Sequence, residues 1–441
     1  MSATLILGQV LWADTTQPPR PGWGLAVEGK RVVEVADHAR LRALYPAAVV
    51  VDATDCVVTP AFVNAHHHMY GVLAHGIPLD AAPSGFWPFL EDFWWPKVED
   101  RLTHELIAAA TEWACLEMVR SGITTFYDCL EAPYALPGAL EVEADVVRRW
   151  GLRGVLSFEA SQRVSVENGE LGLRENATFI DRCHALGGSV TGMMCFHTTF
   201  TCTPSFIQRA FGLAADRGAK VHMHVSEGTY EPEQSLERYG LRSVAFYDQL
   251  GVLGNHVLAS QCVQVDTQEV AILARQGVHI SHQPLSNCEV GGGFAPVPEM
   301  LAAGVNVALG TDGYVSNFFE VMRAAALIPR ARLQDPGTMP ASTIWTMATQ
   351  NGAHALGIVD VGTLEPGKQA DLLLIRGDLP TPLVAHNLAD QLLLWRNPQD
   401  LKAVMCAGEW RLWDGEVAGA DEEAVRVRVV EAAGRLWEKN R

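Results

Sequence analysis

The arrangement of apolar runs in the central part of the chain is the feature that most constrains its fold. Strand-like runs, rich in β-branched and aromatic residues, alternate with longer segments in which apolar residues recur at helical spacing. The runs end at or near His66, Asp128, Glu159, His197, His224, Gln261, His282 and Asp312. The helical segments include 106–120, 140–150, 206–217 and 267–275. Eight strands with helical crossovers predict an α/β fold, the parallel (β/α)8 or TIM barrel.

Nearly every one of these strands ends in an imidazole, carboxylate or amide side chain. The carboxyl ends of the strands meet at one face of such a barrel, and the catalytic residues of barrel enzymes lie on that face. A barrel with a purely structural role needs no such residues there. The sequence therefore predicts a catalytic site at this face.

The two ends of the chain are predicted to form a second, smaller domain. Short strands separated by Pro, Gly and Asp fill residues 1–56, and comparable strands return at 371–376 and 401–413. Residues 420–441 have the apolar spacing of a helix. We therefore expect a small β-sandwich built from residues 1–56 and 366–441, including a C-terminal helix, beside a barrel of residues 57–365.

The triplet His66-His67-His68 follows an apolar run at 56–59 that has the character of a buried strand. In an extended backbone, residues i and i+2 point to the same side, so His66 and His68 can bind one ion while His67 points away. Imidazole is a common ligand of zinc and iron. A histidine run can also be a polar surface cluster, and the triplet alone fits both readings.

Two acids lie close to the ends of later strands. Glu227 follows His224 by three residues, where it is placed to shuttle a proton. Asp312 ends the last strand between Gly310 and Gly313, which let the backbone turn tightly. A plain turn is the alternative reading of this stretch. Together with the histidines, one carboxylate and a water would complete an open catalytic metal site.

Charge and cysteine content limit the partners and the compartment. The chain of 441 residues has a formal net charge of −18. No basic surplus is left to neutralise phosphates, so we expect neither nucleic acid nor an anionic membrane as a partner. Nine cysteines at unrelated spacings indicate free thiols in a reducing compartment. Because no signal peptide and no membrane-length apolar stretch is visible, the sequence favours a cytoplasmic protein.

An aromatic cluster follows the histidine triplet: Phe86, Trp87, Phe93, Trp94 and Trp95. These side chains have two readings, as loop residues that pack over helices or as a lid and substrate wall. Loops on the catalytic face of a barrel often have the second role.

Several stretches, in the same order along the chain, carry a family resemblance. They are 60–68, 121–125 with Asp128, 197–202, 224–227, 284–287, 303–313, 347–353 and 362–371. Together they resemble the amidohydrolase superfamily, in the chlorohydrolase and aminohydrolase branch that contains cytosine, guanine and methylthioadenosine/S-adenosylhomocysteine deaminases. Residues 159–163 and 175–176 are also similar to aminohydrolases associated with selenium metabolism.

The resemblance implies one divalent metal ion, with zinc preferred to iron, bound by His66, His68, His224 and Asp312. The ligand set suits both metals. His197 stands where binuclear relatives carry a bridging lysine carbamate. A binuclear site is therefore not expected.

The resemblance also implies substrate contacts. In nucleoside-deaminase relatives the position of His197 contacts substrate, and a Glu in a stretch like 95–103 holds the ribose, which points to Glu99. A solvated loop acid is the alternative reading of Glu99. Ser316, four residues after Asp312, is a further predicted substrate contact.

One position departs from the family pattern. The family usually has a histidine after its sixth strand, where this chain has Gln261. His256 cannot replace it, because five residues of strand place it roughly 16 Å away. Gln261 can form hydrogen bonds but cannot carry a proton, so His282, at the end of the next strand, is predicted to take over part of the role.

These features predict a non-peptide C–N hydrolase that releases ammonia from an amino-substituted N-heterocycle, namely a purine or nucleoside, pterin, pyrimidine or triazine. Glu227 would protonate a ring nitrogen and Asp312 would pass a proton to the leaving amine. One alternative is hydrolysis of another C–N or a C–Cl bond on a similar ring. Another is a catalytically weakened member that binds a metabolite. Relatives are often dimers or larger, so a homo-oligomer is expected.

Overall fold

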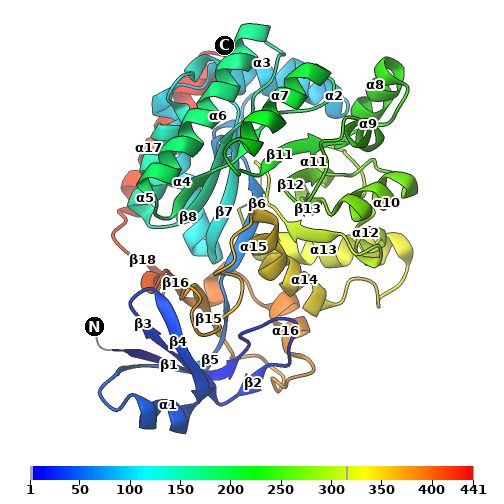
Figure 1. Cartoon of the computed structure of the whole chain (residues 1–441). Coiled ribbons are helices and arrows are strands. Elements are labelled where there is room, and N and C mark those ends of the chain that lie inside the picture. The colour runs from blue at the N-terminus through cyan, green and yellow to red at the C-terminus, as the bar shows by residue number, and fades with distance from the viewer. Residues whose placement is uncertain (1–2, 314–315, 441) are drawn as a thin grey trace. The chain divides into compact units, whose positions relative to one another are not determined.

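The computed structural model describes residues 3–313 and 316–440 and has a mixed α/β architecture (Figure 1). The chain divides into two compact units. Unit 1 comprises residues 1–64, 116–125 and 316–420, and unit 2 comprises residues 65–115, 126–315 and 421–441. The domain boundaries expected from the sequence stay a prediction.

Strands from both ends of the chain form one nine-stranded sheet in unit 1. Strands β1 and β5 pair in parallel, and β5 pairs with β15 in antiparallel orientation. Successive side chains of β1 alternate between the two faces: Ile6 packs in a cluster with Val58 and Leu372, and Leu5 packs in another with Leu41. The strands are β1 Thr4–Leu11, β2 Arg20–Pro21, β3 Trp23–Glu28, β4 Arg31–Asp37, β5 Val49–Pro60, β15 Leu372–Arg376, β16 Leu401–Cys406, β17 Glu409–Trp413 and β18 Glu416–Val417.

The remaining strands form two further sheets, in the order β6-β7-β8-β9 and β10-β11-β12-β13-β14. Every pair in the second sheet is parallel, and β8 and β9 are also parallel. Within the second sheet the carboxyl ends of the strands therefore lie at one edge. The strands are β6 Phe62–His67, β7 Ile123–Leu130, β8 Arg153–Phe158, β9 Val190–Gly192, β10 Met194–Cys195, β11 Val221–Val225, β12 Val257–Gln261, β13 His279–His282 and β14 Asn306–Leu309.

Helices connect the parallel strands: α5 and α6 pack against β8, and α7 packs against β10 and β11 (Figure 1). Helix α10 begins with a capping box. The side chain of Asp266 accepts hydrogen bonds from backbone N–H groups of the first turn, and the side chain of Glu269 accepts one from the backbone N–H of Asp266. The α-helices are α1 His38–Leu44, α2 Phe86–Pro88, α3 Trp95–Lys97, α4 His104–Ser121, α5 Ala139–Trp150, α6 Val166–Leu186, α7 Pro204–Ala215, α8 Tyr230–Tyr239, α9 Ser243–Gln249, α10 Thr267–Gln276, α11 Pro284–Glu289, α12 Val297–Ala302, α13 Phe318–Leu333, α14 Ala341–Ala348, α15 Gln350–Leu356, α16 Leu388–Trp395 and α17 Glu422–Glu438.

Shorter helical turns complete the fold. They are the 3₁₀ turns η1 Met69–Ala74, η3 Glu99–Arg101, η4 Pro133–Ala135 and η5 Pro398–Asp400, and the π-helical segment η2 Phe89–Trp94. Within the described residues, no helix is both long enough and apolar enough to cross a lipid bilayer.

The strand that carries the histidine triplet differs from the one expected. The apolar run at 56–59 belongs to β5, in the nine-stranded sheet, and a separate strand, β6, begins at Phe62. His66 therefore lies within a strand, and His68 follows it directly. The apolar runs of β5 and β6 lie so close together that their sequence predicts a single strand followed by a loop.

Candidate metal and catalytic site

Three histidines converge in unit 2. The ring nitrogens of His66, His68 and His224 that could bind one ion all lie within 4.8 Å of one another, and all three residues are buried. Strand β6 supplies His66, and β11 supplies His224. Asp312 is the fourth predicted ligand, and its Oδ1 lies 3.7 Å from His68 Nε2. The fold thus brings together all four residues.

The loop that carries Asp312 is held against β6. The backbone N–H groups of Thr311 and Asp312 donate to the carbonyl of His66. The Nδ1 of His67 lies 2.5 Å from the carbonyl oxygen of Asp312. His67 therefore holds the loop in place and is not part of the candidate metal site with His66 and His68. Gly310 makes this approach possible, because a Cβ there would lie 2.9 Å from the Cβ of His66.

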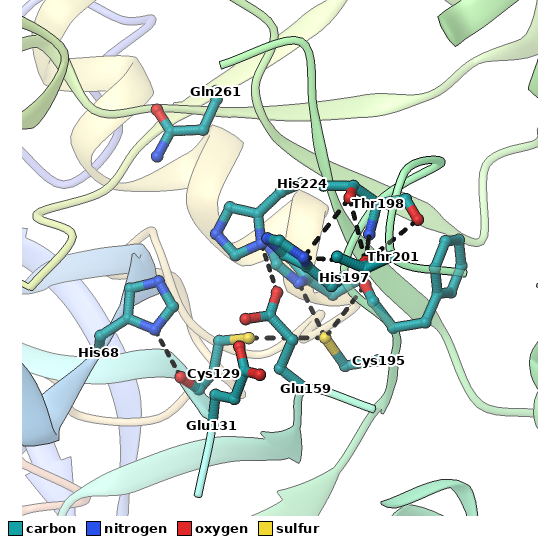
Figure 2. A network of polar contacts seen from close by, with 12 residues as sticks. His68, Cys129, Glu131, Glu159, Cys195, His197, Thr198, Thr201, His224 and Gln261 are labelled. Atoms are coloured by element: carbon teal, nitrogen blue, oxygen red, sulfur yellow. Dashed lines mark hydrogen bonds and ion pairs between the residues drawn. The ribbon is translucent and has the colours of Figure 1, made fainter. Parts of the chain in front are cut away.

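The imidazoles have the protonation that a metal site needs. Burial lowers the pKa of His66, His68 and His224, and neighbouring imidazoles lower that of His66 further. The Nδ1 of His68 donates to the carbonyl of Cys129 (2.6 Å), and the Nδ1 of His224 donates to Glu159 (2.6 Å; Figure 2). With a carbonyl and the carboxylate of Glu159 as acceptors, Nε2 of each ring keeps its lone pair. This donor set fits a divalent metal ion.

Glu159 has a role that the sequence did not reveal. It follows β8, is buried, and its Oε1 accepts from His224. A carboxylate behind a ligating histidine fixes the orientation of the ring and raises its basicity. Burial and the nearby Glu131 raise the pKa of Glu159. Its place after a predicted strand was the available signal, but spacing cannot show which histidine it contacts.

Gln261 fixes Asp312 in place. Its Nε2 donates to Asp312 Oδ2 (2.6 Å), and its Oε1 accepts a short hydrogen bond from the amide of Asn287 in α11. The backbone N–H of Gly313 donates to the other oxygen of Asp312 (2.8 Å). Both carboxylate oxygens are therefore oriented by donors. Asn287 belongs to a motif used for the resemblance, but its contact with Gln261 appears only in the fold.

Glu227 lies just beyond β11 and is half-buried. Burial raises its pKa well above the usual range, and the nearby Asp312 and Glu159 add to this shift. A carboxyl group with a raised pKa can hold a proton near neutral pH and release it to a base. Glu231 fixes the adjacent loop, since it accepts from the backbone N–H of Thr199 and of Ser226.

One pocket joins these groups to the predicted substrate contacts. His68, His224, Glu227 and Asp312 line it together with His197 and Glu99. The Nδ1 of His197 lies 3.0 Å from Thr201 Oγ1, and burial lowers the pKa of this histidine to about 3. It is therefore neutral. The aromatic segment also contributes to the lining, with Phe86, Phe89, Leu90, Trp94 and Trp95.

Glu99 is not a solvated loop acid, because it is buried and bound on both sides. The hydroxyl of Tyr70 donates to Glu99 Oε1 (2.7 Å), and Arg163 donates to its Oε2 (3.2 Å). Arg163 also donates to Glu131 through a short bond. No local pattern indicates this cluster, because its members lie far apart along the chain.

The two remaining predicted site residues are His282 and Ser316. His282 ends β13 and is buried, its Nδ1 has no hydrogen-bond partner among the described groups, and burial lowers its pKa to about 4. Ser316 lies in unit 1, and its hydroxyl donates to Glu117 (2.6 Å). The catalytic role of His282 and the substrate contact of Ser316 stay predictions.

Comparisons with known proteins agree with this chemistry. The model of the amidohydrolase family matches residues 57–411. The chain is 37% identical over 438 residues to a 5-methylthioadenosine/S-adenosylhomocysteine deaminase from Moorella thermoacetica, with 96% of this chain and 98% of that protein covered. It is 33% identical over 427 residues to a 5′-deoxyadenosine deaminase from Methanothermobacter thermautotrophicus, with coverage of 93% and 94%. A solved adenosine deaminase from Xanthomonas campestris with bound zinc is 26% identical and has a TM-score of 0.89 over 99% of this chain and 98% of that one.

Proposed function

The chain belongs to the amidohydrolase family, and from that premise we propose that it is a metal-dependent deaminase of purine nucleosides. The family match confirms the resemblance seen in the sequence. The deaminase names of the relatives support the predicted class, a hydrolase that acts on non-peptide C–N bonds. The single observation that carries the proposal is the convergence of His66, His68 and His224, two of which line one pocket together with Asp312 and Glu227.

We propose one divalent metal ion, zinc in preference to iron, held by His66, His68, His224 and Asp312. The lone pairs left on His68 and His224 by their Nδ1 hydrogen bonds support this assignment, as does the bound zinc of the adenosine deaminase neighbour. When bound, such an ion supplies an activated water at neutral pH.

The chain's own residues move the protons. Glu227, whose pKa is raised by burial, protonates the purine ring nitrogen next to the carbon that is attacked. Asp312 accepts a proton and passes it to the departing amine, while Gln261 and Gly313 hold its oxygens in one orientation. We propose that neutral His197 hydrogen-bonds the purine and that Glu99 binds the sugar, and both residues line the pocket.

We further propose that the parallel strands close into an eight-stranded barrel, with β9 and β10 forming one broken strand. Two isolated parallel bridges, His67 with Asp312 and Ala160 with Phe196, support closure, because they join the two parallel sheets at both edges. The nine-stranded sheet would form the small β-sandwich. A homo-oligomer and a cytoplasmic location remain part of the proposal, and the nine free cysteines fit a reducing compartment.

Ammonia release from zinc-reconstituted protein tests the function. The substrates are adenosine, 5′-deoxyadenosine and methylthioadenosine, beside cytosine, guanine, an aminopterin and an aminotriazine. We expect release from the adenosine-type nucleosides, with equal formation of the inosine-type product, and a loss of at least about 100-fold in Glu227→Gln. Release only from a non-nucleoside ring, or from none of the compounds, would contradict the proposal.

A further inference from the structure

The lining of the pocket is rich in acidic side chains. Five of its residues are acids, namely Glu99, Glu131, Glu159, Glu227 and Asp312, and no lysine or arginine lines it among the residues that the structure describes. Three of these acids belong to the catalytic end. Glu159 binds His224, Asp312 binds Gln261, and Glu227 is the proposed proton carrier. Glu99 and Glu131 remain, and neither takes part in the proposed chemistry.

The cation next to these two acids is already surrounded by carboxylates. The side chain of Arg163 is only 8% exposed and pairs with Glu99 (3.2 Å), Asp100 (2.8 Å) and Glu131. Its guanidinium lies over the ring of Trp95, 5.1 Å from the centroid. Three acids thus face one guanidinium. An incoming carboxylate would have to displace one of them to reach Arg163, and it would meet the other two.

Glu131 lies among other carboxyl groups. The residue is buried, and its Oε1 is bound to Arg163. Its side chain is also within hydrogen-bonding reach of the carboxyl groups of Glu99 and Glu159. A ligand group that reaches this cluster therefore meets acceptor oxygens, to which a hydroxyl or an ammonium group can donate, whereas a carboxylate cannot.

We propose that this cluster selects nucleosides by charge, accepting an uncharged or cationic substituent at the 5′ position and rejecting a carboxylate. The inference rests on the proposed function, which places the purine amine at the catalytic end and leaves the sugar side for the cluster of Glu99, Glu131 and Arg163.

Equilibrium binding to the zinc-loaded Glu227→Gln protein tests the proposal without turnover. The probes are 5′-deoxyadenosine, 5′-amino-5′-deoxyadenosine and adenosine-5′-carboxylic acid, which are similar in size and differ in charge. We expect the amine to bind at least as tightly as the neutral nucleoside, and the carboxylate to bind about 100-fold more weakly, equivalent to about 2.7 kcal/mol. Binding of the carboxylate within about threefold of the neutral probe, or no binding of any probe, would overturn the proposal.

Two further variants, in the same background, localise the effect. Glu131→Gln should reduce the discrimination against the carboxylate by about tenfold, because it removes one of the opposing charges. Glu105→Gln removes an equal charge from a side chain that is 81% exposed, and it should leave the discrimination unchanged. If Glu131→Gln does not fold, the binding of the three probes to the protein with the intact cluster still tests the proposal. Charge-ordered binding without any deamination would refute the proposed function and leave the charge selection standing.

Discussion

The side chain of Gln261 connects two polar groups of the site, with its amide N–H on Asp312 and its carbonyl on Asn287. A histidine at this position could carry a proton, whereas glutamine can only direct one group toward another. Gln261 therefore orients Asp312, but unlike a histidine it provides no group that titrates. This arrangement argues against a merely weakened site, because the replacement residue is fully engaged.

Replacing Gln261 with Leu should lower kcat for the nucleoside by about 10- to 100-fold, as is typical when a supporting hydrogen bond behind a catalytic residue is lost. Zinc content should stay close to that of the unmodified protein, since the ligands remain. Steady-state kinetics and metal analysis check this outcome. Gln268→Leu, at an exposed position of α10, is the matched control. An unchanged kcat in Gln261→Leu would mean that the contact with Asp312 is not used.

Replacing Glu159 with Gln should weaken zinc binding by about 10- to 100-fold, because a neutral amide supports the His224 ring less well than a carboxylate. Competition with a chromophoric chelator measures this affinity. Glu170→Gln removes an acid from α6 that pairs with Arg209, and its zinc affinity should not change. If Glu159→Gln and Glu170→Gln bind zinc with equal affinity, Glu159 does not support the metal site.

The pairing of Glu131 with Arg163 predicts a pH-dependent stability. Burial alone would raise the pKa of Glu131, but Arg163 lowers it to about 2, below the 4.5 of an unpaired glutamate. A carboxyl whose pKa is lower in the folded state stabilises the fold above the unfolded pKa, and the contribution is lost as the pH falls through the folded value. Glu131→Gln should therefore cost about 3 kcal/mol at pH 7.

Urea unfolding at several pH values measures this difference. The difference in the free energy of unfolding between the unmodified protein and Glu131→Gln should be largest above about pH 5 and should decrease toward pH 3. A gap of the same size at pH 7 and at pH 3 would show that the charge of Glu131 does not contribute.

Among the elements, helix α17 shows how a terminal segment is fixed to the catalytic unit. Val425, Val429, Ala432 and Leu436 are buried on one side of it, with the spacing of an amphipathic helix. The indole N–H of Trp437 donates to the carbonyl of Leu73 (2.8 Å), in the turn that follows the histidine triplet. The helix thus buttresses the segment that leaves the metal site.

Trp437→Phe keeps most of the ring and removes this hydrogen bond. We expect the free energy of unfolding to fall by about 1 kcal/mol, because the Leu73 carbonyl loses its donor. Chemical denaturation checks the value. Trp395→Phe is a suitable control, since that side chain lies in α16 and is 64% exposed. Equal stability of Trp437→Phe and the unmodified protein would contradict the proposed buttress.

The elements also show how far the sequence alone could lead. Short apolar runs located the strands that end at or near Glu159, His224, Gln261 and His282, because buried parallel strands are apolar along their length. The boundary between β5 and β6 was missed, since both runs are apolar and only Ala61 lies between the two strands. Which sheet a strand joins is decided by long-range pairing, which a local pattern does not contain.

The same limit applies to the site. Local motifs and the family resemblance pointed to His66, His68, His224, Asp312 and Glu227, because each lies in a recognisable stretch of a few residues. Their roles stay predictions. The partner of Glu131, Arg163, lies 32 residues away along the chain. Asn287 lies 26 residues from Gln261. Contacts of this kind depend on the packing of neighbouring loops.

At the scale of the whole molecule, the residues of the candidate site are concentrated in one compact unit. All the predicted metal ligands and proton carriers, and every predicted substrate contact except Ser316, lie in unit 2. The acidic character of the chain, with a formal net charge of −18, extends into the pocket itself. A bound cation would therefore neutralise charge at the site, and removal of the metal should lower both activity and thermal stability.

The most direct test of the account is a zinc titration of metal-free protein, with deamination of 5′-deoxyadenosine as the readout. One site made of His66, His68, His224 and Asp312 predicts that activity rises in proportion to added zinc and levels off at one equivalent per chain. His224→Ala should reach no comparable activity at the same zinc concentration. Activity in the metal-free protein, or a rise that continues to two equivalents, would contradict a single-metal deaminase site.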